Sequence, residues 1–483
     1  MKKNEINRIK KNEKHEQERK FKRRVRKEIT HRNGVPLLTK KMIRELKSHT
    51  NPLEQLIIII TKVFPSLLND LSKLTDTRNA SYIEYSMQEI TLIRLIALCC
   101  GIQSMKEIVT KLNKKEFIKN INKILNVELT EFPCDDTISN VINSIDIIEL
   151  EKLRTKLTKK LIEAKTLDKF RLFNGSFYVV IDGSGLFSTK IDLGKNCIYK
   201  IHNKGSENEY IEYQYYVLEA KLICNDYVFS FATEFVENEY MNNETEKQDC
   251  ELKAAHRLLD KIRKNYPKLP ITIGADALYV NKPFMDACKE HKMDYILRYK
   301  DTVMSSIMEE FNNIEKTTFD EYEYVNDIGF GSGTKQSEGT TNIIKFSSQN
   351  IVNNKQLDNT VDLTKNLNYT TFMFITSLHI TKNNYKEIVS FGRRRWKIEN
   401  QGFKAQKSKV LNIEHCYTFD SNGSKAHYYF IQIAHLLLTI LYYGSSIIKK
   451  LKETKVEISN LIYQEIIKIQ ELNLEQGFQI RFD

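Results

Sequence analysis

The sequence lacks the patterns that mark several large classes of protein. Its eight cysteines include no C-x-x-C pair and are thinly spread over 483 residues. That distribution excludes a disulfide scaffold or zinc finger and predicts a reducing compartment. Neither a Walker sequence nor a G-x-S-x-G elbow is present. The first twenty residues are charged and have no apolar stretch, so we expect no signal or transit peptide.

The positive charge is concentrated at the start of the chain. Residues 1–50 hold 18 Lys and Arg against 6 Asp and Glu, whereas the other 433 residues hold 56 of each sign. The whole net charge of +12 therefore lies in this segment. It predicts a flexible basic arm over residues 1–34, which either binds a polyanion by counterion release or only keeps the chain in solution.

A chain of 483 residues allows about three domains, and the domain that follows the arm is predicted to be helical. Apolar residues recur at three- and four-residue spacing from residue 35 to residue 170, with Ser, Thr or Asp near several starts. We expect a helical N-terminal domain over 35–170. Its position beside the basic arm is a modest indication of DNA binding.

At Asn174-Gly175 the pattern changes from helix to strand. Strands are predicted over residues 176–182, 214–223, 227–236, 271–276 and 294–300. Helices are predicted over residues 245–265 and after Asn281 and Pro283. This order predicts the first part of a mixed α/β core over 171–300, with crossover helices joining its later strands.

The pattern is interrupted over 301–369, a Gly- and Asn-rich stretch that we interpret as an insertion with some β structure. The second part of the core is predicted over 370–450, with a strand at 370–378 and helices at 385–407 and 426–451. A helical extension is expected over 451–483. The apolar run 430–443 is too short to span a membrane and holds Gln432 and His435, so we expect a buried helix.

Three carboxylates are candidates for a metal site. Asp182 is predicted to end the first strand and to open a turn at Gly183-Ser184-Gly185. Asp276 ends a later strand, and Glu399 lies on the helix after the last strand. Functional groups gather at the carboxyl ends of strands in α/β sheets, so these residues can converge and supply hard oxygen ligands. The alternatives are that Asp276 caps a helical turn and that Glu399 lies on a solvated face.

Basic residues surround Glu399 in the run RRRWKIENQGFKAQKSK. Seven positive charges accompany this one acidic residue, which favours phosphate binding over a salt-bridged surface helix. Arg395 and Glu399 are four residues apart and share a helix face, so Arg395 can hold a phosphate beside the metal site or pair with Glu399. His415, His427 and His435 lack metal-ligand spacing and are expected to be structural.

Several of these blocks together resemble a known enzyme family. IDGSGLFSTK, IGADALYVNKPFMDACKEHKMDYIL and GRRRWKIENQGFKAQKSKVLNIEHCY are similar to the three signature blocks of DDE-type transposases of bacterial insertion sequences. The resemblance covers about residues 130–440 and implies an RNase H-like core preceded by the helical domain. It also implies that Asp182, Asp276 and Glu399 form the catalytic, metal-binding triad.

The resemblance includes departures from the Y-x-x-R-x-x-x-E-x-x-x-x-x-x-K signature. Arg395 and Glu399 match, but the Tyr position is Gly392 and the Lys position is Gln406. Lys407 is one residue late, consistent with one extra residue near Gly402, so Lys407 and Lys404 are alternatives for the lysine. The variant R-W-K-I-E-N-x-G-F resembles a subgroup of the family. The expected DNA-binding residues are Arg393, Arg394, Arg395, Trp396, Lys404 and Lys407.

The resemblance implies a transposase that cuts at the ends of its mobile element and transfers the 3′-hydroxyl ends into target DNA. Two Mg²⁺ ions, replaceable by Mn²⁺, are the expected cofactors. The expected partners are double-stranded DNA, at the terminal inverted repeats and the target, and a second copy in a synaptic homodimer. No membrane partner is expected, and the expected location is the bacterial cytoplasm, at the nucleoid. The alternatives are a decayed or domesticated DNA-binding derivative and a plain RNase H-like nuclease.

Overall fold

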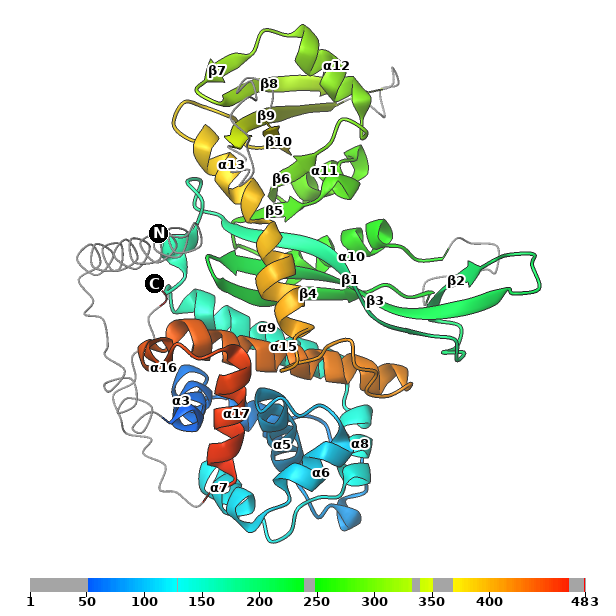
Figure 1. The fold of residues 1–483 in the computed structure, drawn as a ribbon, viewed down its shortest axis with the longest axis vertical. Coiled ribbons are helices and arrows are strands. Elements are labelled where there is room, and N and C mark those ends of the chain that lie inside the picture. Colours follow the sequence, from blue (N-terminus) through cyan, green and yellow to red (C-terminus); the bar gives the residue numbers. More distant parts are fainter. Residues whose placement is uncertain are drawn as a thin grey trace, which may run out of the picture. The chain divides into compact units, whose positions relative to one another are not determined.

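The computed structural model describes residues 51–127, 129–238, 248–331, 339–350 and 368–468, together with Phe482. The chain divides into two compact units, residues 1–51 with 450–452 and residues 52–449 with 453–483. The predicted basic arm over 1–34 lies outside the described residues. Figure 1 labels the helices and strands of the larger unit.

Helices occupy the first part of this unit and confirm a helical N-terminal region. Among them, α5 begins with a capping box: Ser86 N–H donates to Glu89 Oε2 at 2.7 Å, and Glu89 N–H donates to Ser86 Oγ at 3.3 Å. The helices and helical turns are α3 (Pro52–Ile58), η1 (Ile59–Val63), α4 (Leu67–Ser72), η2 (Ala80–Tyr82), α5 (Met87–Cys99), α6 (Met105–Leu112), α7 (Lys115–Leu125), α8 (Asp135–Ser144), α9 (Ile147–Glu163) and η3 (Asp168–Phe170).

Ten strands within the described residues form one sheet in the order β2-β3-β1-β5-β6-β10-β9-β8-β7, with β4 paired to β3. β1 runs parallel to β5, and β5 runs parallel to β6, whereas the other pairs are antiparallel. The predicted mixed sheet is therefore confirmed. The strands are β1 (Phe177–Thr189), β2 (Ile198–His202), β3 (Tyr210–Cys224), β4 (Tyr227–Phe235), β5 (Ile271–Ala275), β6 (Asp294–Tyr299), β7 (Thr317–Phe319), β8 (Tyr322–Phe330), β9 (Gly339–Asn350) and β10 (Asn368–Thr376).

Two local predictions are wrong. β1 does not end at Asp182 but continues to Thr189, because β3 stays paired with it: Asp182 faces Glu219 and Gly183 faces Leu218. The predicted turn at residues 183–185 is therefore strand. The helix predicted from residue 245 begins only at Glu251, since residues 248–250 are not helical and 245–247 lie outside the described residues.

Helices from the later half of the chain pack against the sheet. Asn281 caps α11 as predicted, since its Oδ1 accepts the Phe284 N–H at 3.0 Å. These elements are α10 (Glu251–Asn265), η5 (Ala277–Tyr279), α11 (Lys282–Glu290), α12 (Ser305–Asn313), α13 (Tyr385–Arg394), η6 (Ile398–Phe403), α14 (Lys404–Gln406), α15 (Ser421–Gly444), α16 (Ser446–Leu451) and α17 (Lys455–Ile466).

The stretch predicted as an insertion extends the same sheet. β9 pairs with β10, and β8 and β7 follow outward, with α12 packed on β8. The run that starts with α13 then crosses the sheet (Figure 1), and its Phe391, Ile398 and Phe403 enter one apolar cluster with Tyr178 and Val180 of β1. This packing brings the segment that carries Glu399 onto the strand that carries Asp182.

α15 is the buried helix predicted from the apolar run. It contacts β4 of the sheet and also α5, α8 and α9, so it joins the sheet to the N-terminal helices (Figure 1). Most of its side chains are buried. Among the described residues, no helix is both long and apolar enough to cross a membrane.

Candidate active site

Asp182 lies on β1 just beyond the point where the parallel partner ends. The β1–β5 ladder runs from Phe177 to Val180, so Asp182 is two residues past it. Its Oδ1 accepts the Gly183 N–H at 3.1 Å, and about 20% of its side chain is exposed. The carboxylate is thus partly withdrawn from water at the edge where β5 stops.

Asp276 directly follows β5 and caps the short helical turn η5. Its Oδ1 accepts the Leu278 N–H at 2.9 Å. The capping alternative for Asp276 is therefore realised. Because one carboxylate oxygen has further lone pairs and the other is not used in this bond, the cap leaves Asp276 able to bind a cation.

Glu399 stands on a π-helical turn, η6, that follows α13. The Lys404 N–H bonds to the Glu399 carbonyl, five residues back, which is the π pattern. Gly402 leaves room in this turn for the buried Lys221 side chain, since a Cβ there would stand 2.9 Å from Cδ of Lys221 and would displace it. A π turn holds one residue more than an α turn, and the sequence comparison with the family signature predicts one extra residue of this chain near Gly402.

Arg395 joins two of the three carboxylates. Its Nη1 lies 3.6 Å from Asp182 Oδ2 and 3.5 Å from Glu399 Oε1. Burial raises the pKa of Asp182 to about 7; Arg395 acts in the opposite direction, and Glu399 and then Asp276 add to the rise. Asp276, Arg395 and Glu399, which are distant from Asp182 in the sequence, therefore all act electrostatically on its carboxylate.

The donor set has the chemistry of a divalent-metal site, since all three side chains offer hard carboxylate oxygens. Their repulsion at Asp182 is the kind that a bound cation would offset. As the side chains stand, however, no three His, Cys, Asp or Glu groups within the described residues are arranged to hold a metal ion. Arg395 supplies the positive charge between Asp182 and Glu399.

Sequence reasoning missed a fourth carboxylate, Glu251 in the first turn of α10. Tyr216 Oη donates to its Oε2 at 2.9 Å, and Tyr279 Oη donates to its Oε1 at 2.5 Å. A Cβ on Gly183 would lie 2.5 Å from the same Oε2, so the carboxylate rests against the backbone next to Asp182. Glu251 also contributes to the raised pKa of Asp182.

Glu251 thereby links the elements that carry the two aspartates. Tyr216 lies on β3, paired with Gly185 of β1, and Tyr279 closes the turn that Asp276 caps. Glu251 was missed because the helix was predicted to begin at residue 245. In that prediction Glu251 lies inside the helix, where an acidic residue does not indicate a functional site. An acidic residue in a helix's first turn would have been a clue.

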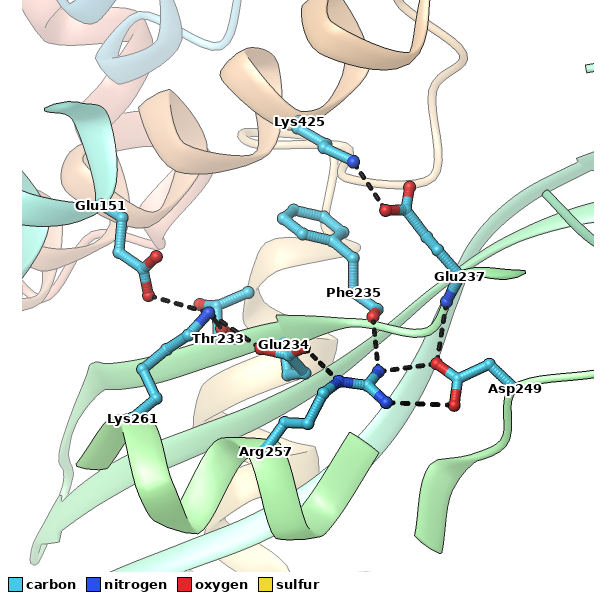
Figure 2. A network of polar contacts seen from close by, with 9 residues as sticks. All are labelled: Glu151, Thr233, Glu234, Phe235, Glu237, Asp249, Arg257, Lys261 and Lys425. Carbon is cyan, nitrogen blue, oxygen red and sulfur yellow. Dashed lines mark hydrogen bonds and ion pairs between the residues drawn. The ribbon is translucent and has the colours of Figure 1, made fainter. Parts of the chain in front are cut away.

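A polar network holds α10 in position, as Figure 2 shows. Arg257 Nε bonds to Glu234 Oε1 at 2.7 Å and its Nη2 bonds to Asp249 Oδ2 at 2.6 Å. Lys261 pairs with Glu234 at 2.8 Å and with Glu151 of α9 at 3.3 Å. These contacts fix α10 against the end of β4, and so fix the turn that presents Glu251.

A buried network lies opposite Asp182 on the same face of β1 and β3. Glu219 accepts hydrogen bonds from Ser230, from Thr233 at 2.6 Å and from Tyr428 at 2.5 Å. Lys221 Nζ lies 3.6 Å from Glu219 and donates to Gln432 at 3.1 Å, and burial lowers its pKa. Its stem packs against Gly402, so this network supports the turn that carries Glu399.

The predicted DNA-binding residues face different directions. Arg393 lies over the Phe372 ring at 5.0 Å and Arg394 over the Phe391 ring at 4.3 Å, so only Arg395 of these three arginines pairs with the carboxylates. Trp396 is 54% exposed, with the Arg395 guanidinium 5.9 Å from its ring.

The structure gives physical reasons for the two positions, Gly392 and Gln406, at which the sequence departs from the family signature. A Cβ on Gly392 would stand 2.6 Å from the Phe374 ring, so no tyrosine fits there. Gln406 is fully buried and donates to Gln432 at 2.6 Å, whereas Lys404 and Lys407 are exposed. Because the π turn adds one residue, Lys407 takes the helical phase that Gln406 would have in a regular α-helix. Lys407 pairs with Glu414 at 2.7 Å.

The three late histidines have no metal-ligand arrangement within the described residues. His427 and His435 are buried, and burial lowers the pKa of both well below the usual value. Arg94 Nη2 lies 2.7 Å from His427 Nδ1, and His435 Nε2 lies 3.1 Å from the Gln401 carbonyl. Their contacts are those of structural groups.

Comparison with known proteins gives the family context. Residues 245–437 match the family model described as a transposase DDE domain, and residues 68–157 match the model described as DDE_Tnp_1-associated. The first match includes Asp276 and Glu399 and begins after Asp182. No curated protein matches the chain.

One solved structure shows a weak likeness. It is a cryo-EM structure of the piggyBac transposase synaptic complex with hairpin DNA, similar over 86% of this chain and 80% of that chain, with 10% identity and a TM-score of 0.37. No conclusion about fold or function rests on a likeness of this size. The two family matches carry the assignment: this chain contains a transposase DDE domain, preceded by its associated domain.

Proposed function

We propose that the protein is a DNA transposase of a bacterial insertion sequence, which cuts at the ends of its element and transfers the 3′-hydroxyl ends into target DNA. The observation that carries this proposal is the pairing of Arg395 with both Asp182 and Glu399, at 3.6 and 3.5 Å. With Asp276 at the end of the neighbouring strand, it supports a three-carboxylate site on an RNase H-like core.

Asp182, Asp276 and Glu399 would hold two Mg²⁺ ions, or Mn²⁺ in their place. When bound, such ions activate the attacking water or 3′-hydroxyl and stabilise the leaving oxygen. The family of the matched domain generally uses divalent metal ions. Glu251, held by Tyr216 and Tyr279, keeps the two strands that carry the aspartates in a fixed relation.

Arg395 is positioned to bind the phosphate next to the scissile bond. Its guanidinium can exchange the two carboxylates for phosphate oxygens, which it can bind in a bidentate manner. Lys407 takes the usual lysine role, because its helical phase fits and its exposed pair with Glu414 costs little to break. Lys404 is the alternative. Arg393, Arg394 and the exposed Trp396 contribute further contacts, the indole by stacking on an unpaired base.

The proposed partners are the terminal inverted repeats, target DNA and a second copy of the chain in a synaptic homodimer at the bacterial nucleoid. A decayed derivative that only binds DNA would not need to keep all three carboxylates. A plain nuclease of the same fold would cut without joining ends, so strand transfer separates it from a transposase.

The direct test replaces each carboxylate by its amide in the full chain. Asp182→Asn, Asp276→Asn and Glu399→Gln should each lower Mg²⁺-dependent cleavage of element ends by roughly 10²-fold or more, the scale of losing one preorganised electrostatic group. End binding should change little. Asp226→Asn is the matched control, since Asp226 pairs with Lys397 away from the three carboxylates. Cleavage at a near-parental rate by any triad variant would refute the assignment.

A further inference from the structure

A groove with a volume of about 850 Å³ lies between α9 and α10, well outside the carboxylate site. Its lining carries three carboxylates, Glu151, Glu163 and Asp260, against six lysines, so it bears a net charge of +3. The six are Lys152, Lys156, Lys159, Lys160, Lys261 and Lys264. The chain beyond residue 50 is neutral as a whole, so this is a local concentration of positive charge.

The lysines of α9 are spaced to follow an extended polyanion. Lys152, Lys156 and Lys160 recur every four residues and therefore form one stripe along the helix, about 12 Å long. Phosphates of one DNA strand follow one another at about 3.4 Å along the axis, so the stripe spans about three or four of them. Lys264 lines the groove from α10, on the other wall.

Some of the groove lysines form ion pairs within the protein, and others do not. Lys156 pairs with Asp70 at 2.7 Å, and Lys261 pairs with Glu234 at 2.8 Å. Lys152, Lys160 and Lys264 are exposed and form no ion pair with any residue that the structure describes. These three ammonium groups can therefore neutralise phosphates without first breaking a contact.

The basic side chains continue along the chain toward the catalytic helix. α9 leads through η3 into a second hollow of about 380 Å³, where Lys169 and Arg171 meet Arg394 of α13. Arg394 directly precedes Arg395, which pairs with Asp182 and Glu399. Lys169, Arg171 and Arg394 share the second hollow with Glu387, so its lining bears a net charge of +2.

We propose that the α9–α10 groove binds the phosphodiester backbone of duplex DNA away from the bond that is cut. The inference rests on the proposed function for the identity of the polyanion. Lysines bind phosphates as flexible point charges without reading bases, so the groove adds affinity and orientation but no sequence preference. It differs from the active site in holding DNA that undergoes no reaction.

The test removes the three unpaired charges together, as Lys152→Gln, Lys160→Gln and Lys264→Gln in the full chain. The matched control is Lys115→Gln, Lys119→Gln and Lys123→Gln on α7, which gives the same change of charge at exposed lysines that do not line this groove. The measurement is the affinity for a duplex of arbitrary sequence between 50 and 200 mM salt.

Each lost phosphate contact lowers the slope of log affinity against log salt by about 0.9, so the groove variant should lose about 2 to 3. Over this fourfold salt range, its affinity should fall about 16- to 64-fold less than that of the parent. The α7 variant should keep the parental slope. An unchanged slope in the groove variant, or an equal loss in both variants, would overturn the proposal.

Two further measurements separate the possible outcomes. If polyglutamate binding is lost in the groove variant while the DNA slope is kept, the groove takes an acidic protein segment and the proposal is wrong. A parental protein that binds duplex through the groove but never cuts element ends in Mg²⁺ would refute the proposed function and leave the groove assignment standing.

Discussion

Replacing Gly183 with alanine should dislodge the Glu251 carboxylate from its place beside Asp182. A Cβ at residue 183 would stand 2.3 Å from Tyr216 Oη and 2.5 Å from Glu251 Oε2, so both side-chain ends must move. The hydrogen bond between them is 2.9 Å long and has a charged acceptor, and losing such a bond costs about 1.5–3 kcal/mol. We expect the free energy of unfolding to fall by that amount.

Gly185→Ala is the matched control on the same strand. A Cβ there would meet only Tyr216 Cδ2, at 4.0 Å, which is an ordinary van der Waals contact. Its effect on the free energy of unfolding should stay within about 0.5 kcal/mol. A comparison of the two alanines therefore separates the collision from the general cost of removing a glycine from β1.

The assay is denaturant unfolding of both alanine variants in the parental chain and in a Tyr216→Phe, Glu251→Ala background. The background lacks the atoms with which the new Cβ collides, so the penalty of Gly183→Ala should disappear there. Cleavage of element ends by Gly183→Ala should fall below that of Gly185→Ala, because Glu251 no longer braces the two aspartate strands. An equal unfolding penalty in both backgrounds would refute the reasoning and assign the cost to the β1 backbone.

Two further predictions concern Arg395 and His427. Arg395→Ala should lower the salt slope of end binding by about 0.9, because one phosphate contact is lost; an unchanged slope would mean that Arg395 serves only its pairs with Asp182 and Glu399. Lowering the pH from 7.5 to 5.5 should reduce the free energy of unfolding through His427, by at most about 1.4 kcal/mol. Burial and Arg94 hold its folded-state pKa below its unfolded value near 6.5, so the unfolded chain takes up the proton first. In His427→Asn, whose amide oxygen can still accept from Arg94, this part of the pH dependence should vanish; a variant that loses as much stability as the parent would contradict the assignment.

Much of the sheet follows from local pattern. The strands β3 to β6 have β-branched and aromatic runs, and Asn281 with Pro283 marks the start of α11, so their order was predictable. The position at which β1 ends was not predictable from the local sequence. Gly183-Ser184-Gly185 has the composition of a turn, and only its pairing with β3, some thirty-five residues later in the chain, keeps it extended.

The candidate site also contains residues that could be predicted from the sequence and one that could not. Asp182 and Asp276 could be expected to converge because parallel neighbours end at one edge of a sheet. Glu251 could not be found, since its role depends on Tyr216 and Tyr279, which belong to other elements and reach it only in the folded chain. The domain limits and the catalytic roles of the three carboxylates stay predictions.

The π turn at Ile398–Phe403 has a consequence for how this chain can vary over evolutionary time. A turn that takes up one additional residue keeps both flanking segments docked, so an insertion at this place shifts the written spacing of a motif without moving the groups that the motif describes. η6 lies between α13 and Gln406 and takes up the additional residue. α13 stays packed on the sheet, and Gln406 stays buried against Gln432. A strict count from Glu399 reaches the buried Gln406, whereas the exposed Lys407 follows one residue later.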